Sequence, residues 1–339
     1  MKIGLFLKNL DEEYQLSIFK GVKAEAEALG MTLICVQGEL LPVKLHRPED
    51  LFPSIRFINF DGIIFLSSVL IDRSDIDYTE QLRKVFAGIP FVSVGDRFFD
   101  YHSIQIRVEK PMMELMEHII VFHGYRKLLF INGPAEHHDS IVRERIFRKA
   151  VKKYRNRYLR LQGTVANGDF LEISGMSITM DYMQKNPDDP PDVIVAANDN
   201  MAIGAQNMLL TRDDPRWRNC PVTGFDDISQ SGLEIPVLTT IRQPLDEMGS
   251  LAVRALYKLI KGKAVKKAIF TNAELIIRNS CGCSVVETTS TENLRSEELS
   301  LTKYRVITNQ YHLRYLSILG RSLVVINTYG EMIQPLHFF

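Results

Sequence analysis

The sequence predicts an α/β protein built from two doubly wound, parallel-sheet lobes, and three observations lead to this prediction. Short apolar runs with the length and branching of buried strands alternate with segments whose apolar residues recur at helical spacing. This alternation starts twice, at residue 2 and again after residue 103. With 339 residues, the chain is also longer than one average domain. Two similar lobes with a cleft between them are therefore expected.

Composition and charge narrow the classes of protein to which the chain could belong. Hydrophobic residues make up 45% of the chain and charged residues 24%, which is typical of a globular protein. The 41 basic residues equal the 41 acidic ones, so the electrostatic footprint of a nucleic-acid binder is absent. The first apolar run stops at Lys8, too early for a signal peptide, and no run approaches the ~20 residues of a membrane span. We expect a cytoplasmic protein with no membrane partner.

The first series of elements predicts a sheet whose strand ends carry polar side chains. Asn9 and Tyr14 follow the first strand. Ser67 follows the third strand, whereas Asp96 and Arg97 follow the fourth. Ligands of open α/β sheets bind at these carboxyl ends, so all five are candidate ligand-binding residues. The expected elements are strands at 2–7, 31–36, 61–66 and 89–94 and helices at 11–29 and 78–87.

Each of these candidates also has an interpretation without a ligand. Turn chemistry alone accounts for Ser67, and a turn or an ion pair with Arg97 accounts for Asp96. Packing in the core is the alternative for Tyr14 and for Phe170, an aromatic residue of the second series.

The second series centres on residues 192–210, where a short apolar strand passes directly into a helix. Asn198 and Asp199 stand at this junction, so either could cap the helix or face a ligand. One arrangement satisfies both interpretations, with Asn198 as the cap and Asp199 toward the ligand. The other expected helices are 109–122, 140–154, 169–183 and 244–261, and the strands are 127–131, 159–161, 221–224, 236–242 and 269–277.

The sequence predicts no metal, no cofactor and no catalysis. Cys281 and Cys283 could clasp a metal, but no second Cys or His pair stands nearby in the sequence to complete four ligands. His118 and His123 are five residues apart on a helix and are expected not to share a face. Residues 136–139 (EHHD) are expected to form a solvated loop. Phosphate-binding loops, zinc-protease histidine pairs and nucleophile-elbow serines are absent from the sequence.

The sequence changes character after residue 284. Residues 287–298 have a polar linker composition, and residues 299–319 carry apolar residues loosely at heptad spacing. Residues 323–326 predict a strand, followed by an apolar ending that suggests a piece of a longer protein. Residues 285–339 are thus expected to be a linker, a helix and the start of an output or dimerisation region.

Five motifs, in order, resemble the ligand-binding core of the lactose and galactose repressor (LacI/GalR) family. That core shares its fold with type I periplasmic sugar-binding proteins, and the resemblance covers about residues 1–283. It implies one lobe from residues 1–103 with 241–269, and a second from 104–240 with 270–284. Three crossover strands join the lobes near residues 103–107, 238–242 and 270–272. The motifs are SIVRERIFRKA (140–150), DVIVAANDNMAIGA (192–205), PVTGFDDI (221–228), LTTIRQPLDEMGSLAV (238–253) and ELIIRNSCGC (274–283).

The resemblance also implies which residues bind the ligand. Arg143 matches the family's cleft arginine, whose planar fork donates several hydrogen bonds in fixed directions. Ile146 replaces the usual glycine of that motif. Asn198 and Asp199 match a polar pair of the cleft, and Asp226 matches its aspartate. Such donors and acceptors suit a small polar ligand such as a carbohydrate, because buried hydroxyl groups need partners.

The expected function is a cytoplasmic ligand sensor that closes on its ligand and signals to a C-terminal output element. The family's repressors carry an N-terminal helix-turn-helix, whereas a strand is expected here from residue 2, so no direct DNA binding is expected. The helices at 78–87 and 244–261 resemble the family's dimer face, which predicts a homodimer. The alternative is a transcription regulator that acts through a protein partner.

Overall fold

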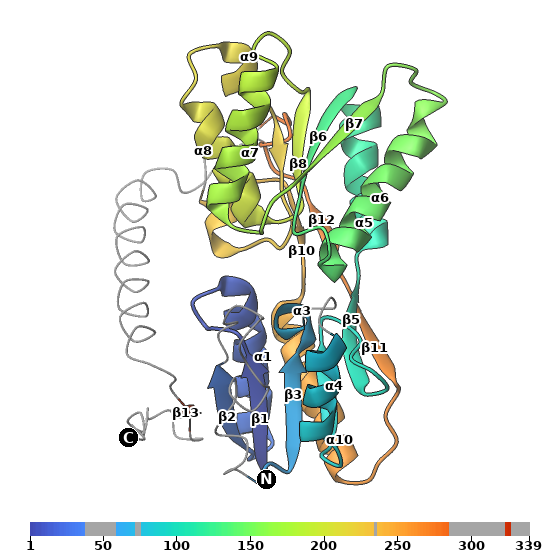
Figure 1. Cartoon of the computed structure of the whole chain (residues 1–339), viewed down its shortest axis with the longest axis vertical. Helices are drawn as coiled ribbons and strands as arrows, with labels where there is room; N and C mark the ends of the chain where they lie inside the picture. Colours follow the sequence, from blue (N-terminus) through green and yellow to red (C-terminus); the bar gives the residue numbers. More distant parts are fainter. Residues whose placement is uncertain (38–58, 72–75, 234–235, 285–322, 327–339) are drawn as a thin grey trace. The chain divides into compact units, whose positions relative to one another are not determined.

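The computed structural model describes residues 1–37, 59–71, 76–233, 236–284 and 323–326 (Figure 1). The chain divides into two compact units. Unit 1 comprises Met1–Ile106, Pro244–Thr271 and Thr289–Phe339, and unit 2 comprises Arg107–Gln243 and Asn272–Thr288. The linker and heptad helix expected over residues 287–319 lie outside the described residues.

Unit 1 is built on a seven-stranded sheet in the order β11-β5-β4-β3-β1-β2-β13. The five strands from β2 to β5 pair in parallel, as in a doubly wound fold. β13 joins β2 in the antiparallel direction at the sheet edge, which confirms the strand expected at 323–326. The strands are β1 Lys2–Leu7, β2 Thr32–Gln37, β3 Gly62–Leu66, β4 Phe91–Val94, β5 His102–Arg107, β11 Ala268–Asn272 and β13 Leu323–Ile326; the helices are α1 Glu13–Ala28, α3 Ser67–Leu70, α4 Ile76–Val85 and α10 Leu245–Ile260.

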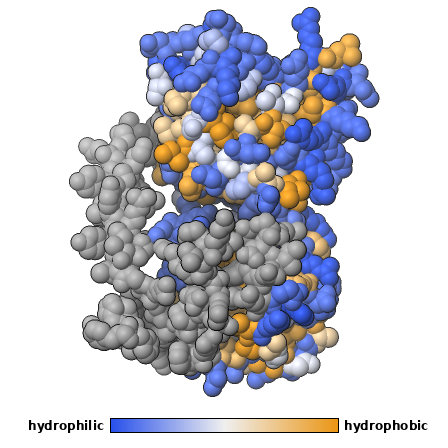
Figure 2. All heavy atoms as spheres, in the orientation of Figure 1, coloured by the Kyte–Doolittle hydropathy of each residue, from blue (hydrophilic) through white to orange (hydrophobic). Residues whose placement is uncertain are grey.

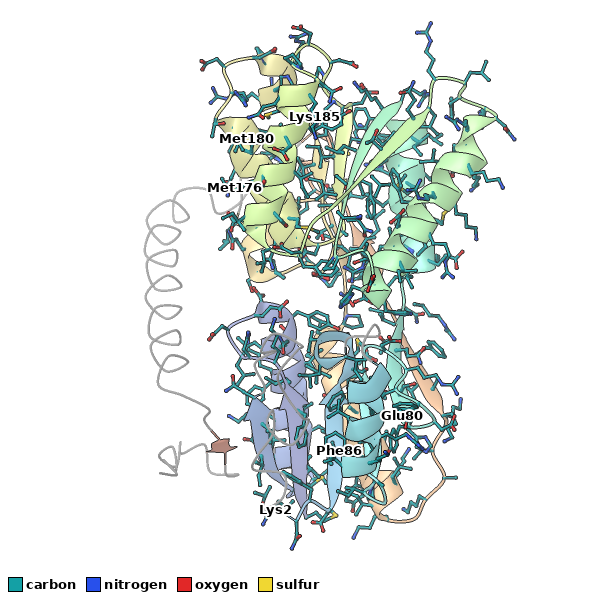
Figure 3. The ribbon with its side chains drawn as sticks, viewed as in Figure 1. Lys2, Glu80, Phe86, Met176, Met180 and Lys185 are labelled. Atoms are coloured by element: carbon teal, nitrogen blue, oxygen red, sulfur yellow. The ribbon has the colours of Figure 1, made fainter. Side chains whose placement is uncertain are left out.

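Alternating residues of β1 divide the core of unit 1 between the two faces of its sheet. Ile3, Leu5 and Leu7 pack with α1 and α10 on one face. Phe6 points to the opposite face, where it meets the ring of Phe86 with the centroids 5.3 Å apart. Figure 3 shows Phe86, just after α4, on the sheet side of that helix. Successive side chains of a strand point to opposite faces, so both faces of this parallel sheet are covered by helices.

Unit 2 has a smaller parallel sheet, in the order β7-β6-β8-β9. Helices α7 and α8 pack together on one side of it and α5 and α6 on the other (Figure 1). A separate antiparallel pair, β10 with β12, completes the unit. The strands are β6 Lys127–Asn132, β7 Gln162–Asn167, β8 Val193–Ala196, β9 Val222–Thr223, β10 Thr240–Arg242 and β12 Glu274–Ile276; the helices are α5 Glu109–Glu117, the π-helix η2 His118–Phe122, α6 His138–Arg155, α7 Glu172–Lys185, α8 Asp199–Leu210, α9 Pro215–Arg218 and the 3₁₀-helix η3 Ser229–Gly232.

The outer side of α7 is partly apolar. Figure 2 shows apolar patches among hydrophilic residues on this view of unit 2. Met176 and Met180, one turn apart, lie along the same side of α7 (Figure 3), and Met180 is exposed. Among the described helices, none is both long and apolar enough to cross a membrane.

The parallel α/β fold expected from the sequence is confirmed, but two strand predictions are wrong. The strand expected at 159–161 instead begins at Gln162. As β7 it is an edge strand with mostly exposed side chains, so it lacks the apolar run that marks a buried strand. The single strand expected at 269–277 is two strands that belong to different sheets, because the chain leaves the first sheet at Ala273.

Two glycines allow α1 and α10 to pack at close range in unit 1. A Cβ atom at Gly21 would lie 1.9 Å from the backbone oxygen of Asp246, and one at Gly249 would lie 2.2 Å from that of Ile18. Both obstacles are backbone atoms, which cannot rotate away. Only residues without a side chain permit this contact.

We therefore expect Gly21→Ala to lower the free energy of unfolding by about 1–3 kcal/mol or more, because the two helices must separate. Urea denaturation followed by circular dichroism measures this loss. Gly232→Ala is the control, since a Cβ there meets no atom within 4 Å. Equal stability of the two variants would contradict the close packing.

Candidate functional site

Arg143 stands on α6 and is almost completely buried, with 6% of its surface exposed. The helix starts after His137, whose side chain accepts a hydrogen bond from the backbone N–H of Asp139. Ile146 and Phe147 are buried on the same helix, which seats α6 on the sheet. Ile146, which stands where the family motif usually has glycine, thus adds buried apolar surface to α6. Arg143 is still buried on the same helix.

The guanidinium of Arg143 lies over an aromatic ring and between two carboxylates. Its carbon is 3.9 Å from the ring centroid of Phe225, a cation–π geometry. Nη1 donates a hydrogen bond to the backbone oxygen of Ala197 at 2.6 Å. Nη2 lies 3.7 Å from an oxygen of Asp139 and 3.8 Å from one of Asp226, beyond hydrogen-bond distance. Donor capacity of the guanidinium therefore remains for a further acceptor.

The charge of Arg143 is balanced by a carboxylate that stays ionised. Burial would raise the pKa of Asp139, but a hydrogen bond from His138 and the positive charge of Arg143 hold it well below its usual value. A buried cation needs such compensation, and an ionised Asp139 one helical turn away supplies it.

Asp226 is presented by a strained turn. Asp226 and Asp227 have φ angles of 119° and 58°, a region that residues other than glycine rarely adopt. Gln243 donates a hydrogen bond to Oδ1 of Asp226 at 2.6 Å. Asp227 is held by Arg242 at 2.6 Å and by Arg278 at 2.7 Å, and these bonds lower its pKa against the opposing effect of burial. The ion pairs of Asp227 therefore fix the backbone that aims Asp226 at Arg143.

Asn198 caps α8, as one of the two interpretations of this position predicts. Its side-chain oxygen accepts from the N–H of Met201 at 3.0 Å, and its amide donates to the backbone oxygen of Phe170 at 2.8 Å. Phe170 has a φ of 69° and packs on Gly133, where a Cβ would lie 2.1 Å from the ring. Asn198 thus holds the loop that carries the half-buried ring of Phe170, 6.0 Å from the Arg143 carbon.

Asp199 is fully buried and does not face outward, which differs from the expectation that it would face the ligand. Its two oxygens accept hydrogen bonds from the hydroxyl of Thr240 at 2.6 Å and from the N–H of Ile228 at 3.0 Å. Burial raises its pKa to about 6. The carboxyl group joins the start of α8 to β10 and to the turn after Asp227.

Two buried oxygen atoms near Phe170 have no hydrogen-bond partner among the described residues. They are Oδ1 of Asn132, at the carboxyl end of β6, and Oγ of Ser140, on the first turn of α6. Gly133 lies between them, and a Cβ there would meet Ser140 Oγ at 2.5 Å. Buried polar atoms are rarely left unpaired, so these two suit a bound water or ligand.

In unit 1, Tyr14, Ser67 and Asp96 gather where β3 and β4 end. The hydroxyl of Tyr14 lies 3.2 Å from that of Ser68. Ser67 is buried and hydrogen-bonded to the backbone of Val94 and Asp96, so turn chemistry occupies its hydroxyl. Asp96 accepts from the backbone N–H of Arg97 at 2.7 Å.

The other two unit 1 candidates are held by local interactions. Asn9 accepts from the N–H of Glu12 at 3.3 Å, just before α1 begins. Arg97 is exposed and pairs with Asp100 at 3.5 Å. Local bonds of this kind form whether or not a ligand binds. The assignment of the unit 1 residues to a ligand site therefore stays a prediction.

Sequence reasoning missed several residues of the Arg143 site. Asp139, Phe225 and Gln243 all contact Arg143 or Asp226. The spacing of Asp139 and Arg143, four residues on one helix, was an available signal. Phe225 and Gln243 gave none, since their positions depend on the turn at 226–227.

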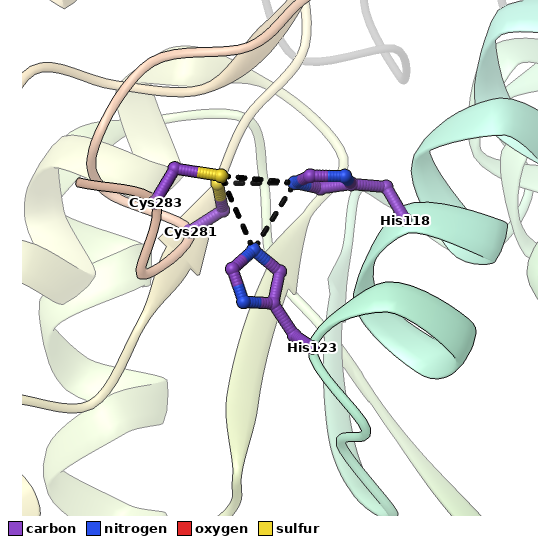
Figure 4. Close-up of side chains that lie close together, drawn as sticks. All are labelled: His118, His123, Cys281 and Cys283. Atoms are coloured by element: carbon purple, nitrogen blue, oxygen red, sulfur yellow. Dashed lines mark hydrogen bonds between the residues drawn. The ribbon is translucent and has the colours of Figure 1, made fainter. Parts of the chain in front are cut away.

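The expectation about metal ligands is wrong in its geometry. His118 and His123 do share a side of their helix, and Cys281 and Cys283 lie beside them (Figure 4). The histidines precede the cysteines by 158 to 165 positions, so the second pair of ligands does not lie near the cysteines in the sequence.

Comparisons with known proteins identify relatives of this chain. Residues 119–281 match the model of the periplasmic binding protein-like domain. The lactose operon repressor of Escherichia coli is 28% identical over 301 residues, which cover 89% of this chain and 80% of that protein. The HTH-type transcriptional repressor MelR of Bacillus subtilis is 27% identical, over 82% of this chain and 77% of that protein.

Solved structures show the same fold. A dimeric lac repressor with a C-terminal deletion superposes with a TM-score of 0.68 at 22% identity, over 83% of this chain and 98% of that one. A complex of the transcriptional regulator CelR with cellobiose also gives 0.68, at 21% identity, over 82% of this chain and 84% of that one. The resemblance to the ligand-binding cores of LacI-family repressors is confirmed.

The buried carboxyl group of Asp199 makes a testable contribution to the pH dependence of stability. Its pKa rises from 3.8 to about 6 on folding. The stability that the protonated carboxyl group contributes to the fold is therefore fully present below about pH 4 and is lost as the pH rises through about 6. We therefore expect the free energy of unfolding of Asp199→Asn to rise relative to that of wild type by on the order of 2–3 kcal/mol as the pH is raised from about 4 to about 7. Urea denaturation at several pH values measures the difference.

The matched control is Asp181→Asn, on the exposed side of α7. This control should run parallel to wild type at every pH. A parallel course for Asp199→Asn as well would show that Asp199 does not titrate near pH 6.

Proposed function

We propose that this chain, which carries a ligand-binding core of the lactose-repressor type, is a cytoplasmic sensor for a small polar ligand. The observation that carries the proposal is the arrangement around Arg143. The guanidinium is fixed by Phe225 and by the backbone oxygen of Ala197, yet its Nη2 lacks a partner at hydrogen-bond distance among the described residues. An oriented donor beside the acceptor Asp226 suits binding rather than catalysis.

A carbohydrate fits the chemistry of this site. The hydroxyl groups of a sugar both donate and accept, so one can bridge Arg143 and Asp226. The unpaired oxygens of Asn132 and Ser140 can accept from others. Phe170 offers an aromatic face for the apolar side of the ring. Relatives named as lactose and ribose operon repressors support this ligand class.

Signalling from the site is the second part of the proposal. Ligand binding would close the two units if the ligand binds the closed state more tightly than the open state. The difference between these two affinities limits how far the ligand can shift the equilibrium. Unit 1 would add Asn9, Tyr14, Ser67, Asp96 and Arg97 to the bound state. We propose that closure alters a homodimer and an output element in or beyond residues 285–339.

The alternative is a transcription regulator that acts through a protein partner. The curated relatives are transcriptional repressors, and this favours a role in gene regulation over other outputs. Capture of a transcription-associated protein in the presence of ligand would support this alternative, whereas a ligand response confined to the chain's own C-terminal region would support an attached output.

A thermal-shift screen tests the ligand. The full chain is heated with monosaccharides, disaccharides, nucleosides and amino acids, each in excess. A ligand at about 100 times its Kd stabilises the folded state by about 2.7 kcal/mol and raises the melting temperature. Stabilisation by a sugar supports the proposal, and a response to amino acids alone would overturn the sugar class.

Arg143→Lys tests the site once a ligand is found. Lysine keeps the positive charge but loses the planar fork, so a charged hydrogen bond worth about 1.5–3 kcal/mol is lost. We expect the Kd from calorimetry to rise about 10- to 100-fold. Arg145→Lys, exposed on the same helix, is the matched control. Equal affinity of Arg143→Lys and wild type would remove Arg143 from the site.

A further inference from the structure

Four potential metal ligands of unit 2 meet in one small cluster: His118, His123, Cys281 and Cys283 (Figure 4). Their ligand atoms all lie within 4.8 Å of one another. Nε2 of His118 is 3.5 Å from the sulfur of Cys281 and 3.4 Å from that of Cys283. Nε2 of His123 is 3.4 Å from the sulfur of Cys283 and 3.1 Å from Nε2 of His118. Two nitrogens and two sulfurs therefore converge on a common point.

The helix that carries the histidines is distorted in a way that brings them together. In a regular α-helix, residues five apart are separated by about 140° around the axis and cannot converge. Here His118–Phe122 is a π-helix, and the N–H of His123 donates to the oxygen of His118, five residues back. This wider turn places the two imidazoles on the same side. π-Helical turns are rare and occur frequently at functional sites.

The cysteines are held against the histidines by Tyr125 and Gly282. Tyr125 donates a hydrogen bond to the backbone oxygen of Cys281 at 3.0 Å. Its ring also stacks on that of His123, with centroids 5.1 Å apart and planes 5° apart. Gly282 has a φ of 96°, and a Cβ there would lie 2.5 Å from the tyrosine hydroxyl. A glycine between the two cysteines is therefore required for this approach.

The distances in the cluster agree with tetrahedral zinc. Zn–N bonds of about 2.0–2.1 Å and Zn–S bonds of about 2.3 Å place neighbouring ligand atoms roughly 3.3–3.8 Å apart at the tetrahedral angle. The N···S distances of 3.4 and 3.5 Å match this range, and the N···N distance of 3.1 Å is slightly shorter. Ordinary contacts between neutral imidazoles and thiols do not require four such groups to share one centre.

We propose that His118, His123, Cys281 and Cys283 bind one zinc ion in a closed, structural Cys₂His₂ site. Two histidines and two cysteines fill all four positions, which leaves none for a substrate. The ion would join His118 and His123, at the two ends of η2, to the segment at 281–283, which lies 158 to 165 positions further along the chain. Its expected role is to stabilise unit 2.

Metal content tests the proposal directly. The full chain is purified without chelator or affinity metal, and zinc is measured by mass spectrometry. We expect about one zinc per chain, and loss of most of it in Cys283→Ser and in His123→Ala. Cys35→Ala is the matched control, because that cysteine lies in β2 of unit 1 and should leave the zinc content unchanged.

Cobalt tests the ligand set. Replacement of zinc by Co²⁺ should give the intense visible absorption of a tetrahedral site with thiolate ligands, and Cys283→Ser should weaken its sulfur-to-metal band. A wild-type chain that takes up no zinc or cobalt, or that keeps its metal after Cys283→Ser, would overturn the proposal. An octahedral cobalt spectrum would do the same.

A test on the wild-type chain covers the case in which the variants fail to fold. Zinc should protect the peptide that carries Cys281 and Cys283 from alkylation, and a chelator should expose it, as mass spectrometry would show. Cys220, buried elsewhere in unit 2, serves as the internal reference. A disulfide between Cys281 and Cys283 in reducing buffer, or equal alkylation with and without chelator, would contradict the site.

Discussion

The buried positive charge of Arg143 determines how the elements at the carboxyl end of the unit 2 sheet are arranged around it. An arginine with only 6% of its surface exposed is tolerable only if other groups replace the water that its guanidinium loses. The backbone oxygen of Ala197, the ring of Phe225 and the ionised Asp139 do this from three different elements. These contacts therefore fix the relative positions of β8, α6 and the turn after β9. A rigid, oriented donor results, as binding of a polar ligand requires.

Around this arginine, acidic residues close in sequence have different roles because their surroundings differ. Asp199 is enclosed without a cation, its pKa rises, and it serves as a link between α8 and β10. Asp227 has two arginine partners, its pKa falls, and it holds the strained turn. Asp226, on the same turn, is left to face Arg143. The motif FDD thus places the carboxylate that holds the turn directly beside the carboxylate that we propose for ligand binding.

Local patterns in the sequence predicted what depends on local physics. The buried parallel strands are predictable because both their faces are covered, and capping was one of the two roles predicted for Asn198 because the helix begins directly after it. β7 was misplaced because an edge strand needs no apolar run. The orientation of Asp199 could not be inferred, since it depends on Thr240, 41 positions away. The cluster of His118 and Cys283 was missed because a helical period of 3.6 residues excludes the π-helical turn.

The two proposed sites of unit 2 lie at opposite ends of one strand. Tyr125 and His123 precede β6 at its amino end, whereas Asn132 ends it at the carboxyl end beside Phe170 and Ser140. Six strand residues separate them by roughly 20 Å, since each adds about 3.3 Å. Ligands of parallel sheets bind at the carboxyl end, so the amino end is free for a stabilising element. The proposed zinc site and the proposed ligand site would therefore lie at opposite ends of β6 without sharing any residue. Loss of zinc need not abolish ligand binding, and loss of the ligand need not release zinc.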